Sequence, residues 1–299
     1  MILSVGEILV DMIGGEKDGV FCYERKAGGA PFNVACAAAK CGAESGFVGC
    51  VGDDIIGTFL EKFVQEQNLT CTYVQRNLAA NTTLAFVELD KTGERSFCFY
   101  RKNTADYRMP EIPDDIFAKA TIVHIGSLML SEAQGEVYAV ALAERAKRAG
   151  KLVSFDVNFR DDIFRDTAAA VSVYKKLIAR ADIVKFSEDE VEIFTKAYVD
   201  SLQDKLVCVS LGGKGSEWRY GGKRAIVESI KVSPVDTTGA GDAFYAGVLS
   251  QIDGQDKSQW TEKLFNKAFR FGNICGALNT LAKGAIDGLP TKAEIKKYL

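Results

Sequence analysis

The stretch with the clearest chemical potential is VDTTGAGDAF, residues 235–244. Its apolar continuation predicts a helix from Asp242 onward, and the Gly-Ala-Gly run at residues 239–241 leaves the preceding backbone amides unobstructed. Unpaired amides and the helix dipole make such a junction a site for anions. A carboxylate there repels phosphate, but it can accept the proton of a hydroxyl that attacks a phosphoryl group. The pattern therefore indicates phosphoryl transfer with Asp242 as the base, and capping of the helix by Asp242 is the structural alternative.

Two familiar phosphate-binding loops do not match this stretch. A dinucleotide-binding fingerprint requires a third glycine where this chain has Phe244, and it would follow the first strand of the fold. A Walker loop requires a lysine and then a serine or threonine after its last glycine, whereas Asp242 and Ala243 follow here.

A second glycine-rich junction, KAGGAPFNVACAAAK at residues 26–40, opens another predicted helix. Gly28 and Gly29 permit close approach of the backbone, and Pro31 suits a first helical turn. Asn33 would point outward from that turn. Taken alone, this junction is explained equally well by packing or by binding.

Short apolar runs alternate with helical patterns along most of the chain. TIVHIGSL, KLVSFDVN, ADIVKFS and KLVCVSLGG have the composition of strands buried on both faces. The N-terminal MILSVGEILVDMI predicts one more buried strand, and residues 232–235 predict a short one. This order predicts an α/β fold with a mostly parallel central sheet flanked by helices, in which ligands bind beyond the carboxyl ends of the strands.

Two segments depart from this alternation. Residues 19–26 and 83–100 alternate apolar and polar side chains like half-exposed antiparallel strands, and DKTG predicts a hairpin turn in the second. We expect a small β-sheet, formed by about residues 11–26 and 83–105, that projects from a single domain of residues 1–299. As a hypothesis, this sheet is a lid over the active cleft; decoration without function is the alternative.

Composition narrows the class of protein. The 299 residues carry a formal net charge of -3 with no basic block, which gives no indication of a nucleic-acid or membrane partner. The eight cysteines include no C-x-x-C pair, and the only histidine, His124, lies in an apolar pattern typical of a core residue. The N-terminus lacks the features of a signal peptide and no apolar run is long enough to cross a bilayer, so we expect a cytoplasmic protein.

The sequences, order and separation of the two glycine-rich junctions resemble the paired signatures of the ribokinase-like (PfkB) carbohydrate kinases. The resemblance extends over essentially the whole chain, from VGEILVDMI to GAIDGLPT. Within that family the chain is most similar to fructokinases, in the segments GERSFCFYRKNTAD, DVNFR, VKFSEDE and KGAIDGLPT. The implied fold is ribokinase-like, with the small β-sheet as its lid.

The resemblance implies that the site brings a sugar to an anion hole. Asp242 would take the proton of the sugar's primary hydroxyl, and Arg160, after a predicted strand, would contact the sugar or the phosphoryl group. The anion hole would comprise Gly239, Ala240 and Gly241. The sugar would be bound by Asp11, Gly28, Gly29, Asn33, Tyr100, Arg101, Asn158 and Asp242.

The resemblance also implies ATP and metal ions as cofactors. Glu190 would act on Mg²⁺ through water, because magnesium dehydrates reluctantly. Ser187 stands where the family has asparagine, which weakens its assignment. A monovalent cation such as K⁺ would be bound by Asp236 and Thr238, with carbonyls of residues 277–284. The nucleotide would be contacted by Lys185, Ser187, Gly212, Gly215, Gly239, Gly241 and Asn273.

We therefore expect an ATP-dependent sugar kinase, in first place a fructokinase that makes fructose 6-phosphate. A 2-keto-3-deoxygluconate kinase is the nearest alternative, because Arg101 and Arg160 are available to bind a substrate carboxylate. Another sugar or nucleoside kinase of the family also stays open. A sugar-binding regulator without catalysis is the alternative from another class, and it would lack the base or the anion hole. The edges of the lid sheet offer a route to a homodimer.

Overall fold

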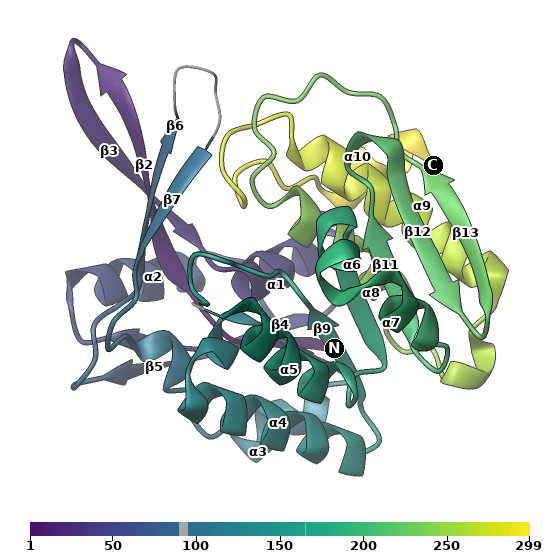
Figure 1. Cartoon of the computed structure of the whole chain (residues 1–299). Coiled ribbons are helices and arrows are strands. Elements are labelled where there is room, and N and C mark those ends of the chain that lie inside the picture. The colour runs from purple at the N-terminus through teal and green to yellow at the C-terminus, as the bar shows by residue number, and fades with distance from the viewer. Residues whose placement is uncertain (90–94, 165) are drawn as a thin grey trace.

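The computed structural model describes residues 1–89, 95–164 and 166–299, which form two β-sheets with helices on both faces of the larger one (Figure 1). The strands of the larger sheet, from edge to edge, are β13 (Lys223–Glu228), β12 (Gly215–Tyr220), β11 (Leu206–Ser210), β10 (Ile183–Ser187), β9 (Leu152–Asp156), β8 (Ile122–Ile125), β1 (Ile2–Val5), β4 (Ser45–Gly52) and β5 (Cys71–Asn77). The strands from β11 to β5 are parallel, and β12 and β13 are antiparallel additions at one edge. The predicted α/β architecture is confirmed.

Helices cover both faces because successive strand residues point to opposite sides, so that Ile2 lies in one core and Leu3 in the other. The helices of the first core are α1 (Ala30–Lys40), α2 (Ile55–Gln65), α8 (Ala240–Ile252) and α9 (Glu262–Asn279). The helices of the second core are α3 (Asp114–Lys119), α4 (Ala133–Arg148), α5 (Thr167–Ile178), α6 (Glu188–Phe194) and α7 (Lys196–Ser201). The short helix α10 (Lys292–Ile295) packs on α9. Single 3-10 turns occur at Ala105–Tyr107, Leu128–Ser131, Gly212–Lys214, Lys257–Gln259 and Lys296–Tyr298.

The smaller sheet, which we call the lid sheet, has the strand order β3-β2-β6-β7. Its strands are β2 (Leu9–Lys17), β3 (Val20–Gly28), β6 (Leu84–Leu89) and β7 (Arg95–Tyr100). It is separate from the larger sheet, as predicted, and the β2–β3 ribbon extends away from the body of the molecule (Figure 1). The antiparallel pairing expected of these segments is confirmed in the two hairpins, β2–β3 and β6–β7, and β2 and β6 pair in parallel between them. The predicted DKTG turn lies outside the described residues.

Two predictions of strands are wrong. The N-terminal apolar run is not one strand but two, because the chain leaves the larger sheet after Val5 and enters the lid sheet at Leu9. Residues 232–235 form no strand; instead the amide of Val235 donates to the carbonyl of Thr280 at 2.7 Å. Both segments are apolar, but apolar composition alone does not make a strand, because a strand must pair with residues that are distant in the sequence.

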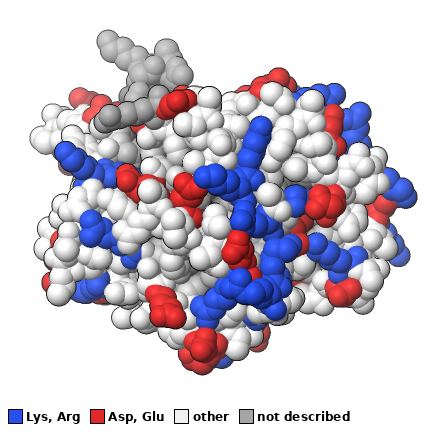
Figure 2. Space-filling model, turned by 60° about the horizontal axis from the view of Figure 1, so that its bottom comes forward, with Lys and Arg blue, Asp and Glu red and all other residues white. Residues whose placement is uncertain are grey.

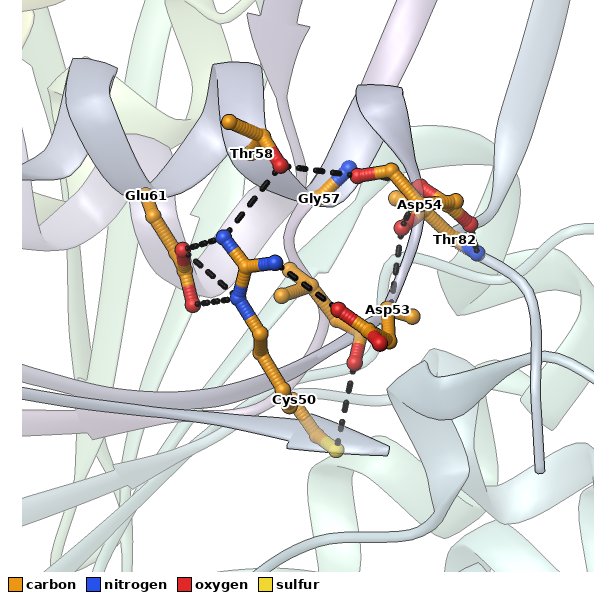
Figure 3. A network of polar contacts seen from close by, with 10 residues as sticks. Cys50, Asp53, Asp54, Gly57, Thr58, Glu61 and Thr82 are labelled. Carbon is orange, nitrogen blue, oxygen red and sulfur yellow. Dashed lines mark hydrogen bonds and ion pairs between the residues drawn. The ribbon is translucent and has the colours of Figure 1, made fainter. Parts of the chain in front are cut away.

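A polar cluster joins the base of the lid sheet to helix α2, which packs on the larger sheet (Figure 3). The Asp54 carboxylate caps α2 by accepting from the amide of Gly57 at 2.7 Å. It also accepts from the amide of Thr82 at 2.7 Å and from the Thr82 hydroxyl at 2.8 Å, just before β6. Nearby, the Arg76 guanidinium donates to Glu61 and to Asp53. The base of β6 is therefore fixed to the start of a core helix.

The remaining surface and core features are ordinary. Charged side chains of both signs are interspersed on the face shown in Figure 2. All eight cysteines are free thiols. Among the described residues, no helix has the length and apolar character needed to cross a membrane. His124 is a core residue, as predicted: its Nδ1 lies 3.1 Å from the Ser154 hydroxyl, and burial lowers its pKa to about 3.

Candidate active site

Two cavities meet at the start of α8, beyond the carboxyl ends of the parallel strands. The lid-side cavity has a volume of about 280 Å³, and the loop-side cavity has a volume of about 520 Å³. Thr237 and Gly241 line both. The lid-side lining includes Glu7, Leu9, Asp11, Gly29, Asn33, Phe99, Asn158, Arg160, Lys185, Gly239 and Asp242. The loop-side lining includes Ser210, Gly212, Gly215, Lys231, Ala240, Phe244, Asn273, Gly276 and Thr280.

The start of α8 has the glycine geometry that the sequence predicted. Gly239 adopts a left-handed conformation with φ of 72° and caps the helix, and a Cβ atom there would lie 2.6 Å from Cβ of Ala285. A Cβ atom on Gly241 would fit, because its nearest neighbour would be Nζ of Lys185 at 3.5 Å. Asp242 is the third residue of the helix, so the alternative that it is the cap is wrong.

Asp242 is half-buried where the two cavities join. The Asn33 side-chain amide donates to its carboxylate at 2.8 Å and so connects the two glycine-rich junctions. Burial, and next the neighbouring charge of Asp156, raises the pKa of Asp242 to about 6, against the opposing effects of Asn33, Lys185 and Arg160. A carboxylate with a pKa of about 6 is ionised at neutral pH and is more basic than an ordinary aspartate.

Lys185 supplies a buried cation beside Gly241. Its ammonium donates to both carboxylate oxygens of Asp156 at 2.8 Å. Burial alone would lower the pKa of Lys185, but the charges of Asp156 and Glu190 outweigh it and raise that pKa. The lysine therefore stays charged where an anionic group would pass.

Ser187 and Glu190 form a reciprocal capping box at the start of α6. One Glu190 oxygen accepts from the Ser187 amide at 2.7 Å, and the other accepts from the Phe159 amide at 2.7 Å. Burial raises the pKa of Glu190. Neither residue lines the two cavities. The pair holds the segment that carries Asn158 and Arg160 in place, and its predicted contacts to nucleotide and metal stay predictions.

The lid-side wall is built on glycines. A side chain at Gly28 would overlap the Asp11 carboxylate, and a Cβ atom at Gly29 would lie 2.5 Å from the carbonyl oxygen of Glu7. The absence of side chains at both positions therefore makes room for Asp11 and for the start of α1. Asn158, with φ of 37°, and the exposed Arg160 complete this wall.

Tyr100 and Arg101 lie outside the lid-side cavity, in an adjoining cavity of about 1190 Å³ that shares only Phe99 with it. Tyr100 is exposed and packs edge-on against Phe86. Arg101 is buried, donates to Asp106 at 2.6 Å and also hydrogen-bonds Ser131. This structure therefore does not bring Tyr100 and Arg101 together with the other residues that were predicted to bind the sugar.

Gly212, Gly215 and Asn273, which were predicted to contact the nucleotide, all line the loop-side cavity. Gly212 and Gly215 line the loop-side cavity with positive φ angles of 56° and 114°. Asn273 also lines it, but its side-chain amide donates to the Val227 carbonyl at 2.7 Å. This hydrogen bond stabilises the cavity wall and occupies part of the donor capacity of the Asn273 side chain.

Asp236 and Thr238 brace the loop before α8. One Asp236 oxygen accepts from the Thr238 amide at 2.8 Å and from its hydroxyl at 2.7 Å, and the other accepts from the Gly284 amide at 2.9 Å. The Asn279 side-chain amide donates to the Thr238 carbonyl at 3.1 Å, while its Oδ1 is buried without a partner among the described residues. Among those residues, no group of three or more His, Cys, Asp or Glu side chains is arranged to hold a metal ion.

The residues that the sequence reasoning missed are Glu7, Phe99 and Thr237, all of which line the lid-side cavity. Glu7 had an available signal, because it is a single charged residue inside the apolar run SVGEILV. Phe99 and Thr237 had none.

Comparisons with known proteins show the family of this chain. The profile of the family described as pfkB family carbohydrate kinase matches residues 1–292. Fructokinase-1 of Oryza sativa subsp. japonica is 35% identical, with 100% of this chain and 97% of that protein covered. The crystal structure of Xylella fastidiosa fructokinase with bound ATP has a TM-score of 0.92 at 31% identity, covering 99% of this chain and 97% of that chain. Vibrio cholerae O395 fructokinase, in a form with bound fructose, ADP and calcium ion, has a TM-score of 0.88 at 31% identity, covering 100% and 98%. The chain therefore belongs to the pfkB family of carbohydrate kinases.

Proposed function

We propose that the protein is an ATP-dependent fructokinase, which transfers the terminal phosphoryl group of ATP to the 6-hydroxyl of fructose. The observation that carries the proposal is the meeting of two cavities at Gly241, beside the basic carboxylate of Asp242. Relatives with bound ATP, or with fructose and ADP, support a nucleotide and a sugar as the two ligands. Fructose would enter the lid-side cavity and ATP the loop-side cavity.

In this proposal Asp242 takes the proton of the fructose hydroxyl as its oxygen bonds to the γ-phosphorus. The bond from that phosphorus to the bridging oxygen breaks, and ADP leaves. Amides of Gly239 and Gly241 hold the charge on the transferring group, helped by Lys185 and Arg160, and the Ala240 amide would join them by exchanging its 3.2 Å hydrogen bond to the Thr237 carbonyl. Proton acceptance and anion binding therefore fall to different groups at one helix end.

The charges of the lid-side cavity favour an uncharged sugar over a sugar acid. Asp11 and Asp242 contribute carboxyl groups to its lining. Arg160 is its exposed cation, since Lys185 is paired with Asp156 and Arg101 is paired with Asp106 outside the cavity. A substrate carboxylate such as that of 2-keto-3-deoxygluconate would contact Arg160 in this cavity, but Arg101 would not be available as the second arginine to bind it.

A divalent ion, Mg²⁺ in this proposal, would enter with ATP and neutralise charge on its phosphates. Glu190 would reach it only through water, since both of its oxygens already accept backbone amides. A monovalent cation fits beside Asp236 and Thr238, because the unpartnered Oδ1 of Asn279 is a buried acceptor in the same loop cluster.

We further propose one domain over residues 1–299, with the lid sheet closing over the sugar. The outer strand β3 exposes Val20 and Phe21, at 65% and 55% of their surfaces, and an exposed apolar edge of this kind suits pairing with a second copy. Eight free thiols are compatible with a cytoplasmic location. Light scattering on the purified protein tests for the dimer, and a mass of one chain at all concentrations would contradict it.

The proposed function is tested by measuring ADP release from the purified protein with a panel of sugars. We expect the highest kcat/KM with fructose. Faster turnover of 2-keto-3-deoxygluconate would identify that sugar acid, and not fructose, as the substrate. Tight fructose binding without turnover of any sugar would favour a regulator without catalysis.

A further inference from the structure

Glu7 is a buried acid at the point where the chain crosses between the two sheets. It lies between β1 of the larger sheet and β2 of the lid sheet, and 0% of its surface is exposed. Apart from the backbone amide of Glu7 itself, neither of its carboxyl oxygens has a hydrogen-bond partner among the described residues. Burial raises its pKa to about 8, so the side chain is mostly protonated at neutral pH.

The space for this carboxyl group is made by glycines on both sides of the crossing. A Cβ atom at Gly126, which follows β8, would lie 2.5 Å from Oε2 of Glu7. On the other side, the Glu7 carbonyl oxygen contacts Gly29 closely enough to exclude a side chain there. The acid is thus packed between the end of a core strand and the junction that opens the lid-side cavity.

The ionisable groups that face Glu7 come from three parts of the fold. Asp106 and Arg101 form the buried ion pair at the base of the lid sheet, where the Thr83 hydroxyl also donates to Asp106 at 2.5 Å. Asp242 faces it from α8, and Tyr174 faces it from α5. One Arg101 nitrogen, Nη2, is buried without a partner among the described residues.

Stability does not explain a buried, unpartnered carboxyl group. Such a group loses its hydration without compensation, and an apolar side chain of similar shape would avoid that loss. Polar residues that cost stability in this way are concentrated at functional sites. Glu7 also lines the lid-side cavity, so its position matches a role in that site.

We propose that Glu7 is a positioning residue of the sugar site, which holds the crossing between the sheets, and with it Gly29 and the lid base, in the geometry that binds the sugar. The inference rests on the proposed function. A neutral carboxyl group can donate one hydrogen bond and accept others through a buried water, toward the ion pair of Arg101 and Asp106. Ionised Glu7 would repel Asp242 and compete with Asp106 for Arg101.

The test compares Glu7→Gln and Glu7→Leu with the unmodified protein. Glutamine keeps the shape and a neutral donor and acceptor but does not titrate, whereas leucine keeps only the bulk. For Glu7→Leu we expect a higher melting temperature and a KM for fructose raised about tenfold, the equivalent of one lost hydrogen bond, with KM for ATP unchanged. For Glu7→Gln we expect a near-normal KM for fructose at pH 7.

The pH profile separates positioning from simple filling of space. In the unmodified protein kcat/KM for fructose should fall above about pH 8, where Glu7 loses its proton, and this decline should be absent in Glu7→Gln. Ser4→Ala is the matched control, because the Ser4 hydroxyl is also buried and unpartnered but does not line the cavity. It should leave both KM values unchanged.

The inference is overturned if Glu7→Leu is more stable with an unchanged KM for fructose, or if Glu7→Gln keeps the alkaline decline. Fructose binding by calorimetry provides a readout that does not depend on turnover. If the unmodified protein neither binds nor phosphorylates fructose, the proposed function fails. If it does both and the Glu7 variants behave like it, the inference alone fails.

Discussion

The two cavities that meet at the start of α8 have very different walls. Charged and amide side chains, among them Asp11, Asn33, Arg160 and Asp242, line the lid-side cavity. Glycines and small side chains dominate the loop-side cavity, and the amide of its one asparagine, Asn273, is bound to the wall itself. The contrast indicates that one ligand is recognised by side-chain charge and the other by shape and backbone groups. Substitutions should therefore act strongly on one side and weakly on the other.

The largest expected effect is that of Asp242→Asn. We expect kcat to fall by roughly 10²- to 10⁴-fold, the usual contribution of a general base. The melting temperature should be kept or raised, because Gly239 rather than Asp242 caps α8 and burial opposes the Asp242 charge. Steady-state kinetics and thermal unfolding check both. Asp287→Asn, at an exposed carboxylate outside both cavities, is the control, and an equal loss there would remove the special role of Asp242.

The next effect tests the boundary between the cavities with a matched pair of glycines. Gly241→Ala should fold normally, since the methyl group has room, yet lose about 10²-fold in kcat because the phosphoryl group must approach that amide. Gly239→Ala should lower the melting temperature, because of its left-handed backbone and its contact with Ala285. Full activity of Gly241→Ala would mean that phosphate does not pass there.

The acid limb of the pH profile is a smaller effect that belongs to the lid-side cavity. Asp242 must be ionised to accept a proton, and its pKa is raised to about 6, so kcat/KM should fall about tenfold per pH unit below that value. The same raised pKa means that ionisation of Asp242 lowers the free energy of unfolding as the pH rises toward 6. Rates measured between pH 5 and 7 at constant ionic strength check the limb. A midpoint near the ordinary aspartate value would contradict the assignment.

The smallest effect belongs to the loop-side cavity. Asn273→Leu removes the hydrogen bond to Val227, so we expect about 1 kcal/mol of lost stability and KM for ATP raised only a few-fold. KM for fructose should not change. A loss in kcat as large as that of Asp242→Asn would break the contrast between the cavities.

The parts of the site that the sequence predicted well are those that depend on local backbone. Gly239 creates the helix start by its left-handed conformation, and Asn33 lies one turn into α1, so a few adjacent residues suffice. Tyr100 was harder, because neighbouring strand residues point to opposite faces and Phe99, not Tyr100, faces the lid-side cavity. Arg101 finds Asp106 through the fold of the lid base.

Glu7 and Glu190 show the same limit for ionisable groups. The environment of Glu7 is set by Gly126, which is distant in sequence, and Glu190 accepts from Phe159 across a loop. The overall α/β fold was legible because it follows from repeated apolar strands and helices along the chain. The parallel pairing of β2 with β6 in the lid sheet was not, because these strands meet only in the folded molecule.

The parallel pairing of β2 with β6 has a consequence for the order of folding. The two strands are separated in sequence by β3, α1, β4, α2 and β5, so their pairing needs the core to have brought Val10 beside Leu84. Contacts between distant parts of a chain form late because loop closure must come first. We expect the amides of β6 to gain protection from hydrogen exchange after those of β1 and β4 during refolding. The lid sheet should therefore complete its strand order only after the core strands next to the site have formed.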